Sequence, residues 1–169
     1  DKLVQKEALQ EAGIPVPAFE AVDSAAELRE TLDDLGYPAM LKAREGGYDG
    51  RGNILVESPE EVEEAFDAIQ GPAMVEEFVD YDRELAVIGC KGDGERDNFP
   101  VTETIHREEI LRETVSPPRT DEETCERARE VATDILDVMD GRGVYGIELF
   151  ERADGRILLN EVAPRPHSS

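Results

Sequence analysis

The sequence predicts an α+β fold made of two small mixed units. Its 169 residues are enough for one good core or two small packed subdomains. Hydrophobic residues make up 39% of the chain and recur at regular spacing, which argues against disorder although 35% of the residues are charged. Segments of helical and strand periodicity alternate without an internal repeat. We place the boundary between the two units at residue 75, giving 1–75 and 76–169.

The first unit begins with two predicted helices. Apolar residues recur at helical spacing over 2–12, and Gly13 follows as a stop. Two prolines make 14–17 extended, which we count as the first strand. Ser24 and Glu27 form a capping-box pattern that predicts a second helix up to residue 35, where a glycine ends it.

A strand pair and a helix complete the first unit. The strands are expected at 39–43 and 53–57, on either side of a glycine-rich loop. Ser58, Pro59 and Glu61 predict the start of a helix that continues to about residue 69, and Gly71-Pro72 ends it.

The second unit is predicted to be mostly strands. We expect strands at 73–79, 83–89, 99–106 and 110–115, and the strongly apolar 83–89 should be central. The best amphipathic helix covers 121–139. Strands at 143–152 and 156–161 flank Ala153-Asp154-Gly155, which is a hairpin signal.

The composition limits the partners of the chain. The net charge of −23 comes from 41 acidic and 18 basic residues spread along the sequence, and such a field repels nucleic acid and anionic membranes. We expect a halophilic cytoplasm, where salt screens this repulsion. No run of 18 apolar residues is present. Cys90 and Cys125 have no metal-binding spacing. Because the chain starts with Asp1, without an initiator methionine, and stops in a polar loop, we expect it to be a fragment of a longer protein.

The loop at 42–52 is the first candidate binding segment. It combines four glycines with Lys42, Arg44 and Arg51 in an otherwise acidic chain. Glycines let backbone N–H groups approach an oxyanion closely, so this composition indicates a phosphate site. The loop fits neither the P-loop nor the dinucleotide pattern. A glycine-rich hairpin without a ligand is the alternative.

The terminal hairpin carries the second candidate site. A turn near Asp154 places Glu148 and Glu161 nearly opposite each other. Two carboxylates about 4 Å apart repel by roughly 4 kcal/mol at an effective dielectric of about 20, which suggests a bound cation such as Mg²⁺. Asn160 could add a neutral oxygen. The alternative is a solvent-facing acidic pair, and the Arg165 and His167 that follow it could equally be incidental surface charges.

Taken together, these residues resemble the ATP-grasp superfamily, whose two α+β subdomains clamp ATP. The order of Lys42, the glycine loop, 76–79, Glu84, Glu148 and Asn160-Glu161 carries this resemblance. The segments 46–52 and 160–167 resemble more specifically the N5-carboxyaminoimidazole ribonucleotide synthetases. That family carboxylates 5-aminoimidazole ribonucleotide with ATP and bicarbonate in purine biosynthesis, through carboxyphosphate. The resemblance covers the whole chain as the ATP-grasp core, and it implies that the family's flanking amino- and carboxy-terminal domains are absent from this chain.

The resemblance implies a role for each matching residue. Glu148 and Glu161 would bind Mg²⁺, the backbone of 76–79 would bind adenine, and Glu84 would bind ribose. Catalytic contacts to bicarbonate and the aminoimidazole would come from Tyr48, Asp49, Arg165 and His167. The full set of implied ATP contacts is Lys2, Lys42, Gly46, Gly47, Tyr48, Asp49, Gly50, Arg51, Gly52, Glu76, Glu77, Phe78, Val79, Glu84, His106, Asn160 and Glu161.

One departure from the family pattern falls at the end of the chain. The family usually has His-Asn-Ser where this sequence has His167-Ser168-Ser169. The shorter serine puts a contact to the carboxyl intermediate in doubt. Two other functions stay open: an ATP-grasp carboxylase or ligase of the formate-using glycinamide ribonucleotide or biotin carboxylase type, and an ATP-binding module without activity. We expect small-molecule substrates and, for the full-length protein, a homodimer.

Overall fold

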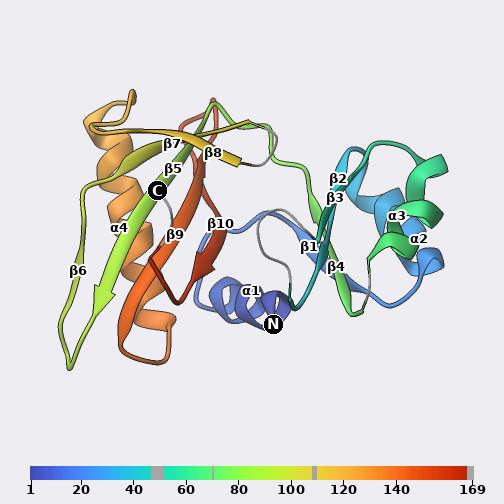
Figure 1. The fold of residues 1–169 in the computed structure, drawn as a ribbon, viewed down its shortest axis with the longest axis horizontal. Helices are drawn as coiled ribbons and strands as arrows, with labels where there is room; N and C mark the ends of the chain where they lie inside the picture. Colours follow the sequence, from blue (N-terminus) through green and yellow to red (C-terminus); the bar gives the residue numbers. More distant parts are fainter. Residues whose placement is uncertain (47–51, 70, 108–109, 167–169) are drawn as a thin grey trace. The chain divides into compact units, whose positions relative to one another are not determined.

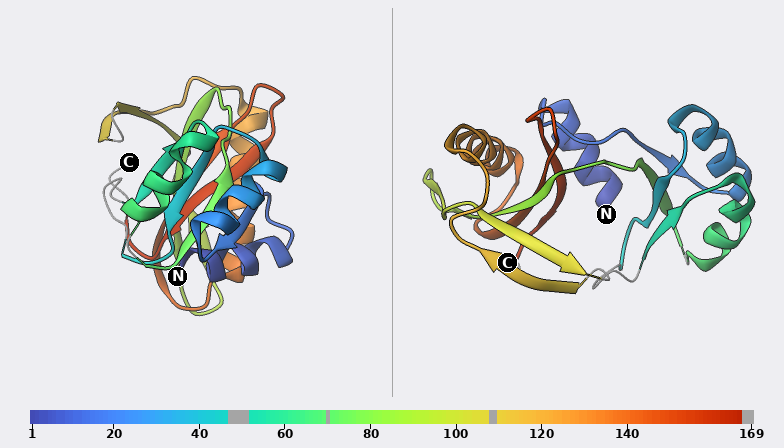
Figure 2. Two further views of the ribbon diagram at one scale, coloured as in Figure 1. Left: turned by 90° about the vertical axis from the view of Figure 1, so that its right-hand side faces the viewer. Right: turned by 90° about the horizontal axis from the view of Figure 1, so that it is seen from above.

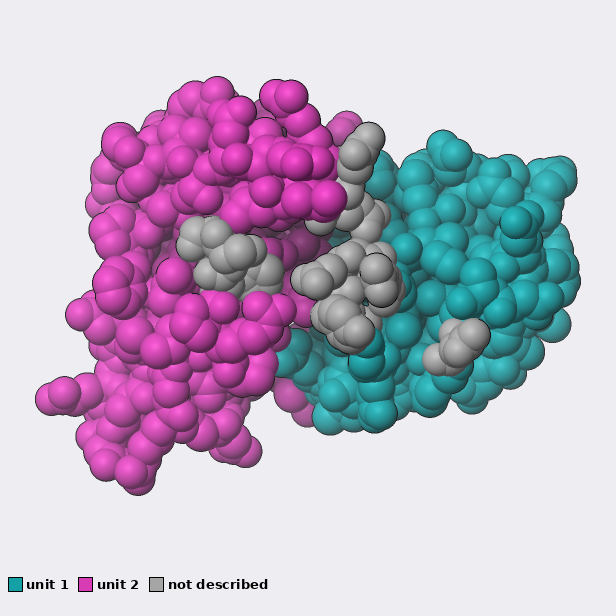
Figure 3. All heavy atoms as spheres, in the orientation of Figure 1, with its two compact units in different colours: residues 1–7, 17–79 teal, residues 8–16, 80–169 magenta. Residues whose placement is uncertain are grey.

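The computed structural model describes residues 1–46, 52–69, 71–107 and 110–166. Within these ranges the chain forms two compact units (Figure 3). Unit 1 contains Asp1–Glu7 and Pro17–Val79, and unit 2 contains Ala8–Val16 together with the chain from Asp80 onward. Helix α1 (Lys2–Glu11) therefore contributes residues to both units.

Unit 1 is an antiparallel four-stranded sheet with helices on one face (Figure 1). The strand order is β1-β4-β2-β3, so β2 and β4 are the inner strands. Between the strands, a short 3₁₀ helix η1 precedes α3. The elements are β1 (Phe19–Val22), α2 (Ala25–Leu35), β2 (Ala39–Ala43), β3 (Asn53–Val56), η1 (Pro59–Glu61), α3 (Val62–Ala68) and β4 (Ala73–Glu77).

The core of unit 1 lies between this sheet and helices α2 and α3. Leu28 and Leu32 of α2 pack with Leu41 of β2 and Val75 of β4, and all four are fully or almost fully buried. Side chains alternate across a strand, so the neighbouring residues on β2 and β4 lie on the opposite face of the sheet. That second face carries Lys42.

Unit 2 is a six-stranded antiparallel sheet in the order β10-β9-β5-β7-β8, with β6 added beside β5. The long strand β5 is central, as the sequence predicts. The elements are β5 (Arg83–Lys91), β6 (Arg96–Asn98), β7 (Thr102–Arg107), β8 (Ile110–Val115), α4 (Glu122–Val138), β9 (Gly143–Glu151) and β10 (Ile157–Ala163).

Helix α4 covers one face of the unit 2 sheet (Figure 2). Its stripe of Ala128, Ala132 and Ile135 packs against Leu85 of β5 and Leu149 of β9, and all five are fully buried. Asp121 begins the helix by accepting a 2.7 Å hydrogen bond from the Thr124 N–H. The residues that alternate with these core positions along β5 and β9 point to the other face of the sheet. We call it the open face of unit 2.

The structure confirms most predicted elements and shifts a few. The capping box at Ser24 and Glu27 is present. The first strand lies at Phe19–Val22, and the predicted strand at 14–17 is extended chain without a ladder, because Pro15 and Pro17 lack the N–H groups that a ladder needs.

Two further differences concern β6 and the unit boundary. Strand β6, which the sequence did not indicate, pairs with β5 after a turn closed by the Gly92 N–H and the Glu95 carbonyl. Unit 1 extends to Val79, so residues 76–79 pack with unit 1. The boundary set from the sequence lies before these residues, at residue 75. Over the described ranges, none of the helices has the length and apolar character needed to cross a bilayer.

Candidate functional site

A buried charge cluster lies on the second face of the unit 1 sheet. Lys42 on β2 forms a 2.5 Å ion pair with Oε2 of Glu76 on β4. Lys6, on α1, forms an ion pair with the other carboxylate oxygen of Glu76. The three residues are only 8%, 3% and 5% exposed, respectively. Two ammonium groups thus contact one buried carboxylate.

The two lysines hold Glu76 in its ionised form. Burial by itself would raise the pKa of Glu76, but the charges and hydrogen bonds of Lys42 and Lys6 outweigh it and leave the pKa below its ordinary value. Each buried charge of this cluster has an opposite charge beside it, as buried charges require.

The chain around the glycine loop is described only in part. Gly46 and Gly52 have φ angles of 72° and 135°, which favour glycine, and the Gly52 carbonyl accepts a 2.7 Å hydrogen bond from the Ala43 N–H. Arg44, which the sequence suggests as a countercharge for phosphate, donates hydrogen bonds to the Asp1 carboxylate through Nε and Nη2. The predicted residues Gly47, Tyr48, Asp49, Gly50 and Arg51 lie outside the described residues, as does His167.

The predicted acidic pair lies on the open face of unit 2. Glu161 on β10 is the register partner of Glu148 on β9, as expected from the hairpin. A β-bulge separates Leu159 from Glu161, so Asn160 is an extra residue in the ladder. Its Nδ2 donates to Oε2 of Glu148 over 3.4 Å. The hairpin register therefore brings the two carboxylates to a single face, and the bulge adds the amide beside them.

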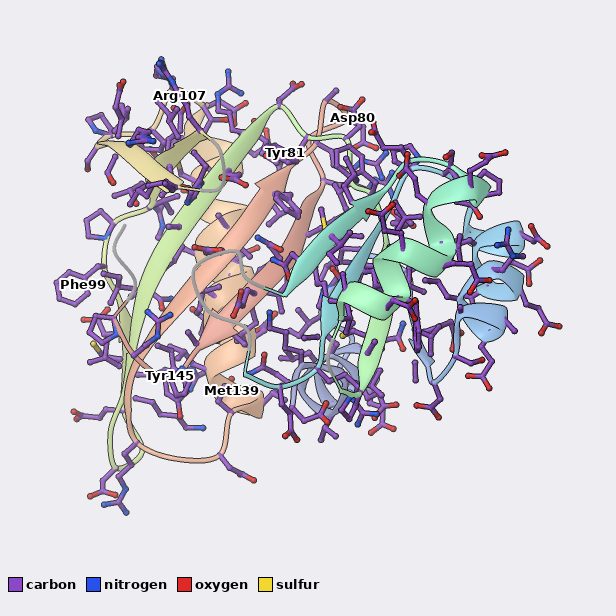
Figure 4. All side chains as sticks on the ribbon, turned by 45° about the vertical axis from the view of Figure 1, so that its right-hand side comes forward. Asp80, Tyr81, Phe99, Arg107, Met139 and Tyr145 are labelled. Carbon is purple, nitrogen blue, oxygen red and sulfur yellow. The ribbon has the colours of Figure 1, made fainter. Side chains whose placement is uncertain are left out.

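A second polar group occupies the same face where β5 begins. Glu84 accepts a 3.1 Å hydrogen bond from the Tyr81 hydroxyl on Oε1, and its Oε2 contacts Nδ1 of His106. The ring of Tyr81, which is labelled in Figure 4, stacks on Phe150 with centroids 4.5 Å apart. Burial, with help from the Glu84 carboxylate, raises the pKa of Tyr81 to about 12, so this hydroxyl stays a donor at neutral pH.

The strand register explains why these groups share a face. Glu84 is the register partner of Phe150 on β9 and of Thr104 on β7, and Glu148 is the partner of Ala86. Residues two apart on a strand point the same way. The structure thus brings Glu84, His106, Glu148, Asn160 and Glu161 to one face, opposite the α4 core.

The remaining predicted residues have simpler surroundings. Lys2 is partly exposed at the start of α1, where its N–H donates to the Arg44 carbonyl. Glu77 ends β4, and its N–H donates to the Ala18 carbonyl. Phe78 is 44% exposed in the segment after β4, whereas the next residue, Val79, is buried. Arg165 is exposed just after β10.

Sequence reasoning missed Lys6 and Tyr81. A helical signal for Lys6 existed, because it lies three residues from both Leu3 and Leu9, and all three are buried. Tyr81 had no such signal, since its partner Phe150 is distant in sequence.

Among the described residues no group of three or more His, Cys, Asp or Glu could hold a metal ion, so Glu148 and Glu161 would need ligands from elsewhere.

Comparison with known proteins identifies the family. A family model described as the ATP-grasp domain matches residues 7–169. The chain belongs to the ATP-grasp family. This ATP-grasp chain is 38% identical over its full length to a phosphoribosylaminoimidazole carboxylase of Schizosaccharomyces pombe, covering 31% of that protein. It is 34% identical to an N5-carboxyaminoimidazole ribonucleotide synthase of Bacillus subtilis, covering 98% of the chain and 44% of the relative.

Solved ATP-grasp structures agree in fold. A carboxyaminoimidazole ribonucleotide synthase from Aspergillus clavatus, complexed with ATP, matches with a TM-score of 0.95 and 36% identity over 99% of this chain and 45% of that one. The Aspergillus clavatus synthase in complex with ADP and 5-aminoimidazole ribonucleotide gives 0.92 and 33%, with the same coverage. The chain thus spans less than half the length of these proteins.

Proposed function

We propose that this chain is the ATP-grasp part of an N5-carboxyaminoimidazole ribonucleotide synthase. The enzyme would be an ATP-dependent ligase that uses bicarbonate to carboxylate 5-aminoimidazole ribonucleotide. The main support is the similarity, over 99% of this chain, to a synthase solved with ADP and 5-aminoimidazole ribonucleotide. We also propose a cytoplasmic location and a homodimer, as expected for a soluble biosynthetic enzyme.

The nucleotide roles are proposed separately for each unit. In unit 1, Lys42 would attract phosphate oxygens with its ammonium group, which the Glu76 carboxylate holds on the second face of the sheet. In unit 2, Glu84 would accept hydrogen bonds from the ribose hydroxyls. Tyr81 and His106 each contact a different oxygen of this carboxylate and hold its orientation.

The open face of unit 2 fits a magnesium ion in the company of phosphates. Mg²⁺ usually takes one or two carboxylates plus substrate phosphates and keeps several waters. Glu148 and Glu161 supply two carboxylates on neighbouring strands, and Asn160 steadies one of them through its 3.4 Å hydrogen bond. When bound there, the ion would offset negative charge on the transferring phosphoryl group.

The proposed reaction has two steps. A bicarbonate oxygen attacks the γ-phosphorus of ATP, so that ADP leaves and carboxyphosphate forms. The exocyclic amine of 5-aminoimidazole ribonucleotide then attacks the carboxyl carbon, releasing inorganic phosphate and one proton. Phosphoryl transfer needs mainly positioning and charge neutralisation from a protein, which the lysine cluster and the held carboxylates can supply. Tyr48, Asp49, Arg165 and His167 keep the substrate roles that the family resemblance implies.

An ADP-release assay tests this function. The protein, as its gene encodes it, is supplied with Mg²⁺ and ATP, and with either bicarbonate or formate. Each acid is combined in turn with 5-aminoimidazole ribonucleotide, glycinamide ribonucleotide or biotin. We expect ADP release to require bicarbonate and 5-aminoimidazole ribonucleotide together. If ADP release requires formate or another acceptor, the proposed substrate is wrong but the chain is still part of an ATP-dependent ligase. If the protein binds ATP but releases no ADP in any combination, it is an ATP-binding module without activity.

A further inference from the structure

The ring of Tyr81 has a fixed place in unit 2. It stacks on Phe150 with the two ring planes only 13° apart, and Phe150 on β9 is the register partner of Glu84 on β5. The next residue, Asp82, donates its N–H to the Glu151 carbonyl over 2.8 Å, which holds the backbone where β5 begins. A phenylalanine ring would stack in the same way. Packing therefore accounts for the ring of Tyr81 but not for its hydroxyl.

The hydroxyl of Tyr81 acts on the Glu84 carboxylate. It donates a 3.1 Å hydrogen bond to Oε1, while Nδ1 of His106 contacts Oε2. Because burial and the neighbouring carboxylate raise the pKa of Tyr81 to about 12, the hydroxyl keeps its proton at neutral pH. The Glu84 side chain is only 17% exposed. Each of its two oxygens is thus held by a different neighbour.

A carboxylate held in this way can still accept hydrogen bonds from a ligand. An ionised carboxylate offers about four lone-pair sites, and the contacts with Tyr81 and His106 use only part of them. The two neighbouring hydroxyls of a ribose are donors at a fixed spacing. A deoxyribose lacks one or both, and would leave a largely buried carboxylate oxygen without its partner, which is costly. The rejection of deoxyribose is stronger when the carboxylate is held in place beforehand.

We propose that Tyr81 makes the nucleotide site of unit 2 selective for ribose over deoxyribose, as a positioning residue that acts through Glu84. Its hydroxyl keeps Glu84 in the orientation that accepts both ribose hydroxyls, and Tyr81 itself needs no contact with the nucleotide. This inference rests on the proposed function, which places the ribose at Glu84. A purely structural Tyr81 would only pack on Phe150, and its loss would affect every nucleotide equally.

Two nucleotides and one substitution distinguish these roles. Tyr81→Phe removes the hydroxyl and keeps the stacked ring. Calorimetry measures the Kd of Mg²⁺–ATP and of Mg²⁺–2′,3′-dideoxy-ATP for the protein as its gene encodes it, at constant salt, with circular dichroism as the check on folding. We expect Tyr81→Phe to weaken ATP binding about fivefold, the effect of one hydrogen bond, and to leave dideoxy-ATP binding within about twofold. The preference for ATP over dideoxy-ATP should therefore fall.

Two further variants serve as controls. Tyr145→Phe is the matched control, because Tyr145 belongs to the α4 core of the same unit and its hydroxyl contacts the Asp140 carbonyl over 3.4 Å. Its preference for ATP should equal that of the unchanged protein. Glu84→Gln should lose most of this preference, and adding Tyr81→Phe to it should lower the preference no further, because the hydroxyl acts through that carboxylate.

Each result decides the inference. A preference for ATP that survives Tyr81→Phe overturns the inference alone, and so does equal weakening of both nucleotides, which indicates a structural role. An equal fall in Tyr145→Phe, or a further fall when Tyr81→Phe is added to Glu84→Gln, also refutes it. If Tyr81→Phe does not fold, the hydroxyl serves folding and the inference is wrong. If the unchanged protein binds no Mg²⁺–ATP, or binds both nucleotides equally, the proposed nucleotide roles fail and the inference fails with them.

Discussion

The substitution Glu76→Gln should destabilise unit 1 strongly. It keeps the size of the side chain but leaves Lys6 and Lys42 buried without the carboxylate that both contact. Two ammonium groups about 5 Å apart repel by roughly 3 kcal/mol at an effective dielectric of about 20. Removing one partner of a buried ion pair typically costs about 3–5 kcal/mol. We therefore expect the free energy of unfolding to fall by about 3 kcal/mol at pH 7.

The effect should depend on pH in a defined direction. Because the folded chain holds the pKa of Glu76 below its ordinary value of 4.5, the stabilisation is fully present above that pH. It is lost as the pH falls through the lower folded pKa, where the unchanged chain also carries a neutral side chain at position 76. The difference between Glu76→Gln and the unchanged chain should then shrink.

Urea denaturation followed by circular dichroism, at constant salt and at several pH values between 3 and 8, measures this difference. Glu77→Gln serves as the matched control, because Glu77 is the next residue and is less buried. A loss below 1 kcal/mol at pH 7 would refute the reasoning. So would a loss of equal size at pH 7 and at pH 3.

Three further predictions concern the candidate site. Lys42→Met should lower ATP turnover at least a hundredfold while the chain stays folded, and near-normal ADP release would contradict its role. Glu161→Gln should raise the Mg²⁺ concentration needed for half-maximal activity, so an unchanged magnesium titration would argue against the metal site. Glu84→Gln should lower the pKa of Tyr81 from about 12 toward the ordinary 10.0, because it removes the carboxylate charge beside the hydroxyl. Tyrosinate absorbance measures this pKa, and an unchanged value would contradict the contact between Tyr81 and Glu84.

Local signals made much of the fold predictable. The helical stripe and Asp121 cap of α4, the capping box of α2 and the central position of β5 follow from spacing and turn chemistry. The pairing of Glu148 with Glu161 was predictable for the same reason, since a hairpin turn sets its own register. These features depend on residues that are close in sequence.

Features that depend on distant residues were not predictable. Strand β6 has the polar sequence Arg-Asp-Asn, and it is held by pairing with β5 and by a 2.8 Å hydrogen bond from Asn98 to Thr133 of α4. The burial of Lys6 depends on Glu76, which lies far along the chain. The spacing from Leu3 and Leu9 could have indicated that Lys6 is buried, but it gives no sign of Glu76.

The bulge in β10 gives the strand one residue more than its pairing with β9 needs. Without Asn160, Leu159 would still pair with Leu149 and Glu161 with Glu148, and the alternation of inward and outward side chains would continue undisturbed into Val162. Pairing and core packing therefore have no need of this residue. A chain lacking Asn160 should form a more regular hairpin and lose the amide that donates to Glu148.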